Sequence, residues 1–134
     1  MDVEKLKFSE LLLNEINLIV ISCDKNGNVN YVSSATEKIT GYSIDNLKGQ
    51  LWWKNTFFSK EEGLIYKEKV YNIITGKTAI STTPYDRRLK CKDGSFKWIE
   101  WRDSLAENNT YVSVGVDISD WKKTEEIKIQ SDTI

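Results

Sequence analysis

The stretch LKCKDGSFKWI, residues 89–99, decides the fold of this 134-residue chain. Its centre, KDGS at residues 92–95, places an Asp-Gly pair between two strand-like runs, which is typical of a tight β-hairpin. The runs on either side, residues 78–92 and 96–103, are rich in the β-branched and aromatic residues that favour strands. We therefore expect two antiparallel strands here.

Three further strands are predicted elsewhere along the chain. Residues 111–118 follow a short turn at 107–109 and carry alternating valines on one face, with Gly115 on the other, where it leaves room for a neighbouring group. Nearer the N-terminus, residues 18–23 and 29–32 flank a run of turn-forming residues and give a second hairpin signal. The sheet is therefore expected to have about five strands.

Serine and glutamate three residues apart mark two helix starts between these groups of strands. Residues 34–37 (SATE) and 59–62 (SKEE) match the capping box, in which the two side chains bond the first free amides of a helix. Gly41 and Gly76 are expected to end the short and the long helix, and a further short helix is predicted at residues 43–47.

The length of the chain suits a single domain. We expect an α+β fold, in which a five-stranded antiparallel sheet carries short helices on one face and an N-terminal helix on the other. The expected boundaries are residues 1–16 for the amphipathic flanking helix, 17–118 for the core and 119–134 for the start of an outgoing C-terminal helix.

The composition excludes several kinds of function. The chain has no histidine, which rules out His-based catalysis, His metal ligation and His-ligated haem. Cys23 and Cys91 lie far apart and form no C-x-x-C pair, so they are interpreted as small buried thiols rather than zinc ligands. No nucleophile–base pair and no phosphate-binding glycine loop is found. We expect no catalytic residue, no metal site and no enzyme activity in this fragment.

Basic and acidic residues nearly balance, 19 against 20, so the chain has no overall field that attracts nucleic acid. A local basic cluster surrounds the hairpin and is interpreted as a solvated strand edge; its members are Arg87, Arg88, Lys90, Lys92 and Lys97. An inward-turned Arg88 or Lys90 that binds an anionic metabolite stays an open alternative.

Neither a membrane span nor a signal peptide is predicted. No apolar run approaches the ~20 residues that a bilayer requires, and the N-terminus lacks the basic and apolar regions of a signal sequence. We expect a cytoplasmic protein, free or as the cytosolic part of a membrane-anchored sensor, with no direct membrane insertion.

Three motifs occur in the order and spacing of a known family. They are DKNG followed by VNYV (residues 24–32), LKCKDGSFKWI (89–99) and VGVDIS (114–119). With them, the chain resembles a PAS domain with its C-terminal PAC segment, over about residues 11–126. It departs from the family at Ser33, where Asn is common, and at residues 58–60, where His-Pro-Asp is common.

The resemblance implies a sensory and dimerisation module of a prokaryotic signal-transduction protein, such as a sensor histidine kinase of a two-component system or a diguanylate cyclase. It also implies a homodimer and a C-terminal helix that relays the state of the domain to an effector domain. Asp117, Ile118 and Ser119 would form the signalling junction at the start of that helix. A ligand-free protein–protein interaction module is the alternative.

The family further implies a small cavity between helices and sheet, which holds haem, flavin, another small molecule or nothing. A covalent flavin–thiol adduct is not expected, because Cys23 and Cys91 fall on predicted strands. Aromatic residues could stack on a non-covalent flavin in a redox sensor, or simply fill the core. The candidate pocket residues are Ile39, Trp52, Trp53, Phe57, Tyr66, Val70 and Trp98; no cofactor is assigned.

Trp98 and Trp101 are three residues apart in one predicted strand, so they point to opposite faces of the sheet. Trp98 is assigned to the pocket and Trp101 to the outer face, which needs a cover to avoid a large apolar patch in water. The N-terminal helix of the same or a partner subunit is the predicted cover, and leads us to expect a parallel homodimer. Its contact residues are Leu6, Leu13 and Ile16, with Trp101 beneath them.

Overall fold

The computed structural model describes residues 16–132. Five strands form one antiparallel sheet in the order β2-β1-β5-β4-β3. They are β1 (Ile19–Cys23), β2 (Val29–Val32), β3 (Tyr85–Lys90), β4 (Phe96–Ala106) and β5 (Thr110–Asp117). The two hairpins predicted from sequence, β1–β2 and β3–β4, are confirmed, and β5 joins them because it pairs with both β1 and β4.

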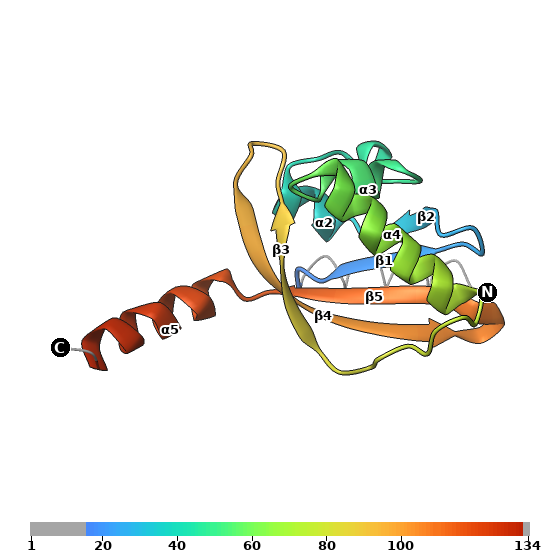
Figure 1. The fold of residues 1–134 in the computed structure, drawn as a ribbon. Coiled ribbons are helices and arrows are strands. Elements are labelled where there is room, and N and C mark those ends of the chain that lie inside the picture. Colours follow the sequence, from blue (N-terminus) through green and yellow to red (C-terminus); the bar gives the residue numbers. More distant parts are fainter. Residues whose placement is uncertain (1–15, 133–134) are drawn as a thin grey trace.

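The helices between β2 and β3 cover one face of this sheet (Figure 1). They are α2 (Ala35–Thr40), the 3-10 turn η1 (Ile44–Asn46), α3 (Leu51–Asn55) and the long α4 (Lys60–Ile74). A second 3-10 turn, η2 (Glu107–Asn109), connects β4 to β5, and α5 (Ser119–Asp132) runs away from the sheet. The predicted α+β architecture is confirmed, whereas the predicted N-terminal helix, with Leu6 and Leu13, lies outside the described residues.

The two predicted helix starts differ in how they are capped. Ser59 Oγ accepts a hydrogen bond from Glu62 N at 3.1 Å, as expected at the start of α4. Ser34, by contrast, makes no side-chain capping bond. The side chain of the preceding residue binds β1 rather than the helix: Ser33 Oγ accepts a hydrogen bond from Val20 N at 2.9 Å. This bond ties the chain that enters α2 to β1.

Strand β3 is shorter than predicted. Residues 78–84 form no strand, and pairing with β4 begins at Tyr85, opposite Trp101. Pro84 explains this boundary, because proline has no amide hydrogen to donate to a strand ladder. The strand expected over residues 78–92 is therefore confirmed only in its second half.

Trp52 of α3 and Trp101 of β4 form the centre of the core. Both side chains are buried, and their rings meet edge to face with centroids 6.2 Å apart. Trp101 fits against β5 because Gly115 has no side chain: an ideal Cβ at Gly115 would lie 2.8 Å from Trp101 Cζ3. The indole of Trp101 thus fills the room predicted beside Gly115.

The structure corrects the assignment of the two tryptophans of β4. They do point to opposite faces, but Trp101 faces the helices and Trp98 faces outward. The register explains this, because Trp101 is paired with Tyr85 and Gly115 on the side that the helices cover. Trp98 lies instead beside α5, where Lys122 Nζ stands 5.0 Å from its ring. Trp101 is therefore a core residue and not part of an outer contact.

Candidate functional site

A cavity of about 270 Å³ lies between the helices and the inner face of the sheet. Its walls come from α3, α4, the segment that follows α4, and strands β1, β3, β4 and β5. Five of the seven predicted pocket residues line it: Trp52, Trp53, Phe57, Tyr66 and Val70. Ile39 borders a separate depression beside Cys91, and Trp98 lies on the opposite face of the sheet.

The aromatic wall of the cavity is held by contacts between α3 and α4. Gly63 lets the two helices approach closely. Trp53 Nε1 donates a hydrogen bond to Gly27 O at 3.1 Å. Phe57 stacks on Trp53 with ring centroids 6.0 Å apart and lies 5.1 Å from the ring of Tyr66. The three rings therefore form one continuous surface.

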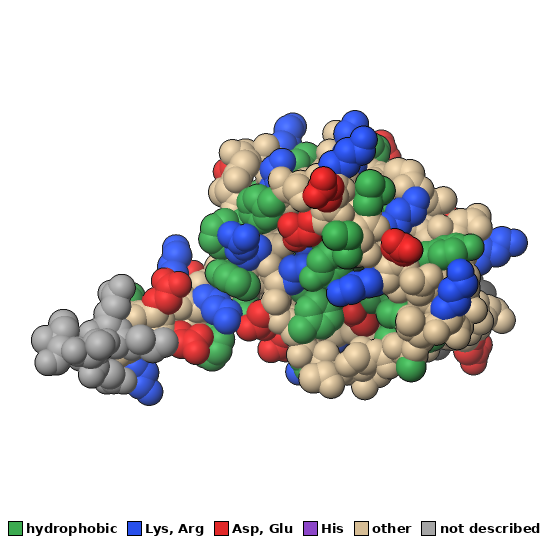
Figure 2. Space-filling model, in the orientation of Figure 1, with side chains coloured by type: hydrophobic (Ala, Val, Ile, Leu, Met, Phe, Trp, Pro, Cys, Tyr) green, Lys and Arg blue, Asp and Glu red, His purple; other side chains and the backbone are tan. Residues whose placement is uncertain are grey.

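Figure 2 shows hydrophobic side chains gathered in the middle of the face that carries α4 and β3, with lysine and arginine side chains beside them.

At the sheet side of the cavity, Asp103 of β4 accepts hydrogen bonds from hydroxyl groups of neighbouring strands. Tyr85 Oη donates to Asp103 Oδ2 at 2.8 Å, and Ser113 Oγ donates to Oδ1 at 2.6 Å. Burial raises the pKa of Tyr85 and of Tyr111 above the ordinary value of a phenol, and the charge and hydrogen bonding of Asp103 raise both further. Both phenols therefore keep their protons at neutral pH and act as donors, so the carboxylate of Asp103 is already engaged.

Arg87 of β3 brings a positive charge to the same cavity. Its Cζ lies 4.4 Å from the ring centre of Phe57 and 5.0 Å from those of Tyr66 and Trp101, within cation–π range. Arg87 Nη1 donates to the backbone carbonyl of Arg88 at 3.3 Å. Burial lowers the pKa of the Arg87 guanidinium, which stays charged because an arginine pKa is so high to begin with. No carboxylate within the described residues forms an ion pair with it.

Two buried nitrogens at this cavity have no hydrogen-bond partner in the described part of the chain. They are Arg87 Nε and Trp101 Nε1, both of which can only donate, and both belong to side chains that line the cavity. Buried polar groups in proteins are nearly always hydrogen-bonded. Two side chains of the cavity wall, next to the aromatic rings, therefore each carry a buried donor without a partner.

Arg87 is a site residue that the sequence interpretation missed. The basic cluster is predicted as a solvated strand edge, with Arg88 or Lys90 as the open inward alternative, but the structure turns Arg87 inward. Arg88 is exposed and packs on the ring of Phe58 at 4.8 Å. The sequence held a partial signal, because Arg87 shares a strand face with the apolar Leu89, two residues away. Only the structure shows that this face is the buried one.

Hydrogen bonds fix the start of α5 to the neighbouring strand. Ile118 N donates to Trp98 O at 2.8 Å, and Trp98 N donates to Ser119 Oγ at 3.0 Å. Asp117 Oδ1 accepts from Ser119 N at 2.9 Å. The three residues predicted as the signalling junction therefore form one connected group between β5, α5 and β4.

One turn further along, α5 also contacts β3. Lys122 Nζ forms an ion pair with Asp86 Oδ2 at 2.9 Å. Asp86 directly precedes Arg87, and successive residues of a strand point to opposite faces. Adjacent residues of β3 therefore face α5 on one side of the sheet and the cavity on the other.

Other chemistries find little support among the described residues. No group of three or more His, Cys, Asp or Glu side chains in residues 16–132 is placed to hold a metal ion. Cys23 and Cys91 are free and buried, as predicted. Burial raises the pKa of both thiols, that of Cys23 to about 12, so they are uncharged at neutral pH. Within the same range, none of the helices combines the length and the apolar character that crossing a bilayer requires.

The family model described as PAS fold matches residues 7–109. The chain therefore belongs to the PAS family, whose members are sensory modules of signal-transduction proteins. A comparison with curated protein sequences gave no significant match.

Solved structures show the same fold. The PAS domain of the quorum-sensing receptor RpfR from Cronobacter turicensis, in complex with BDSF, has a TM-score of 0.59 and 20% identity over 76% of this chain and 94% of that one. A sensory box histidine kinase/response regulator from Burkholderia thailandensis has a TM-score of 0.64 and 19% identity, over 93% of this chain and 95% of that one. The N-terminal domain of a diguanylate cyclase with a PAS/PAC sensor from Marinobacter aquaeolei has a TM-score of 0.57 and 16% identity, over 76% and 95%. At these identities the likeness concerns the fold alone.

Proposed function

We propose that this domain senses a small molecule in its cavity and passes the state of the cavity to α5. The observation that carries the proposal is the cavity itself, about 270 Å³, lined by aromatic rings and by two side chains that each carry a buried donor without a partner. Protein cores are close-packed and contain few voids larger than a water molecule, whereas ligand sites are mostly apolar hollows with a few placed polar groups. The similar receptor domain solved with BDSF supports a ligand-binding role for this fold.

Strand β3 offers a route from the cavity to α5. Arg87 lines the cavity, and the adjacent Asp86 pairs with Lys122 of α5. A ligand that contacts Arg87 would bind one arrangement of β3 and α5 better than another, and so shift the population between them. The junction of Asp117, Ile118 and Ser119 is the point at which α5 would change its direction relative to the sheet.

The wider setting follows from the family and from the similar structures. We assign the domain to the cytoplasmic part of a signalling protein, as a homodimer in which α5 leads to an effector domain. A histidine kinase and a diguanylate cyclase are the candidate effectors, because similar domains occur in proteins of both kinds. The domain itself would bind no nucleic acid and catalyse no reaction.

Native mass spectrometry of the purified protein tests the proposal. We expect a bound small molecule that is released when the protein is denatured. Ile73→Trp should lose it, because Ile73 lines the cavity and a larger side chain would occupy the space. Ile65→Trp is the matched control: it adds the same bulk to an exposed position of α4, and should retain the molecule.

Two outcomes would replace the proposal by an alternative. Protein with no bound molecule, or equal occupancy in Ile73→Trp and wild type, would favour a ligand-free interaction module. A visible absorption band that is lost when the protein is denatured, together with release of a flavin mass, would favour the redox sensor instead.

A further inference from the structure

The cavity holds an excess of hydrogen-bond donors. Arg87 Nε and Trp101 Nε1 are the buried side-chain nitrogens or oxygens without a partner in the described residues, and neither can accept a hydrogen bond. They lie close together, since Arg87 Cζ is 5.0 Å from the ring centre of Trp101. The acceptor at the same cavity, Asp103, already binds the hydroxyls of Tyr85 and Ser113. The missing partner is therefore an acceptor.

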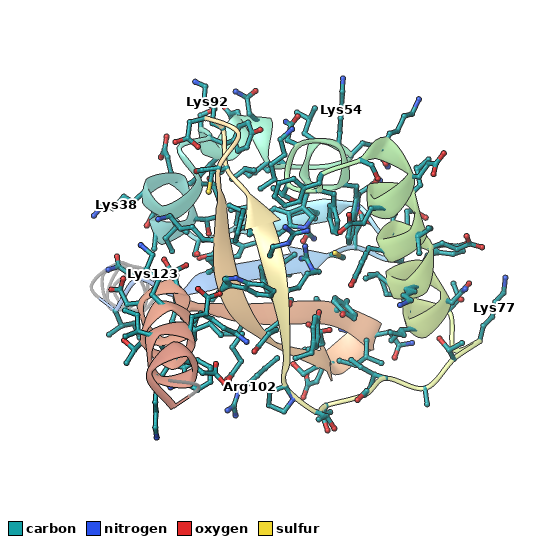
Figure 3. The ribbon with its side chains drawn as sticks, turned by 60° about the vertical axis from the view of Figure 1, so that its left-hand side comes forward. Lys38, Lys54, Lys77, Lys92, Arg102 and Lys123 are labelled. Carbon is teal, nitrogen blue, oxygen red and sulfur yellow. The ribbon has the colours of Figure 1, made fainter. Side chains whose placement is uncertain are left out.

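The charge at the cavity is also incomplete. Arg87 has no ion-pair partner within the described residues, and the carboxylates of Glu62 and Asp103 act on it only through space. The cations labelled in Figure 3 project outward from the fold toward solvent, and one of them, Arg102, also pairs with Glu100. Arg87, by contrast, packs its guanidinium among aromatic rings. A buried charge of this kind is stabilised by a group of opposite charge, and a guanidinium matches the geometry of a carboxylate.

The remaining walls define the rest of the ligand. Trp52, Trp53, Phe57 and Val70 offer apolar surface, and about 270 Å³ lies just below the usual range of ligand pockets, about 300–1,000 Å³. Arg87 is the buried cation of the cavity and balances one negative charge, whereas Lys69, which also lines the cavity, is exposed to solvent. A doubly charged phosphate would also stand close to the carboxylate of Asp103. We infer that the ligand is a small amphipathic monocarboxylate, whose carboxylate accepts hydrogen bonds from Arg87 Nε and Trp101 Nε1 while its apolar body lies against the aromatic wall. This inference rests on the proposed function, because it names the ligand class of the same cavity.

The test compares 2-naphthoate with 2-naphthamide, which share their ring system and differ in charge. Binding of each to the purified protein is measured by isothermal titration calorimetry. We expect 2-naphthoate to bind about tenfold or more tightly than the amide, the equivalent of one charged hydrogen bond. A second pair, decanoate and decanamide, is compared in the same way. In these compounds a flexible alkyl chain takes the place of the flat naphthalene ring.

Variants assign the preference to the two donors. Arg87→Leu should weaken 2-naphthoate binding by about 10- to 100-fold and change 2-naphthamide binding by less than about threefold. Arg88→Leu is the matched control, because the neighbouring arginine lies on the other face and should leave both affinities unchanged. Trp101→Phe keeps a ring in the core and removes the second donor, and should weaken 2-naphthoate binding by about threefold or more. Circular dichroism verifies that each variant is folded.

The outcomes separate this inference from the proposed function. Equal binding of acid and amide in both pairs would overturn the carboxylate assignment and leave a ligand-binding cavity in place. A preference for the acid that survives in Arg87→Leu would likewise overturn it. Failure of all four compounds to bind wild-type protein that has been freed of any bound molecule would overturn the inference. The proposed function would fall with it only if native mass spectrometry also finds no bound molecule.

Discussion

Gly63 sets how closely α3 and α4 approach each other, and with them the aromatic wall of the cavity. An ideal Cβ at this position would lie 2.1 Å from Trp53 O, a backbone atom that cannot move without its helix. In an exposed helix interior, replacement of glycine by alanine is favourable by about 1 kcal/mol. The contact with Trp53 should reverse the sign of that effect.

We expect Gly63→Ala to lower the free energy of unfolding by about 1–3 kcal/mol, the usual cost of overpacking a core. Urea denaturation followed by tryptophan fluorescence measures it. Glu68→Ala serves as the control, because Glu68 is exposed on the same helix and its replacement should change stability by less than about 0.5 kcal/mol. Unchanged or increased stability of Gly63→Ala would show that the two helices are farther apart than described.

At the scale of elements, β3 contacts the cavity with the side chains on one face and α5 with those on the other. Arg87 and Leu89 point toward the helices, whereas Asp86 and Arg88 point away from them. The outward side binds α5 through the ion pair of Asp86 with Lys122. Both side chains are partly exposed, so the pair adds only a small stabilisation, and it is suited to a contact that can open.

We expect Asp86→Asn to loosen the first turns of α5 from the sheet. Amide hydrogen exchange of α5 measures this, and should become faster while exchange in the core strands stays unchanged. A double-mutant cycle with Lys122→Met should give a small favourable coupling energy between the two side chains.

The control for this prediction is the other ion pair of the described residues, Arg102 with Glu100. Arg102→Gln should leave exchange in α5 unchanged, because Arg102 pairs with Glu100 of its own strand. Equal exchange rates in Asp86→Asn and wild-type protein would mean that the ion pair does not hold α5, and would remove β3 from the proposed signalling route.

At the scale of the whole molecule, the outer face of the sheet is the surface proposed for the homodimer. Val112, Val114 and Val116 of β5 point away from the helices, and Val116 is 44% exposed. Ile16, one of the predicted contact residues, is 56% exposed. Exposed apolar residues of this kind favour an interface with a second copy of the chain.

We expect the full chain to sediment as a dimer at micromolar concentration, and Val116→Asp to shift it to a monomer, because a carboxylate in an apolar interface is costly. Sedimentation velocity measures the state of each protein. Ile65→Asp, an equally exposed apolar position on α4, is the control and should stay dimeric. A wild-type protein that is only monomeric would rule out the dimer, and would leave the cavity and its ligand untouched.

Much of the fold could be predicted because its signals are local. The Asp-Gly turn of residues 92–95 requires a positive φ, and Gly94 has a φ of 87°. The start of α4 depends on a bond between Ser59 and Glu62, only three residues apart. Five of the seven residues predicted for the pocket line the cavity, because they lie on or beside α3 and α4, whose aromatic density is visible along the chain.

The amino-acid sequence by itself indicated the five strands, the positions of α2, α4 and α5, and which residues of each strand share a face, but not the helix α3. Only the tertiary structure decided which face became the core, and therefore that Trp101 and Arg87, rather than Trp98, line the cavity. The physical reason is that strand alternation has a period of two and is blind to which of the two sides the helices cover. Which side the helices cover depends on packing between residues far apart in the chain, such as Trp52 of α3 against Trp101 of β4.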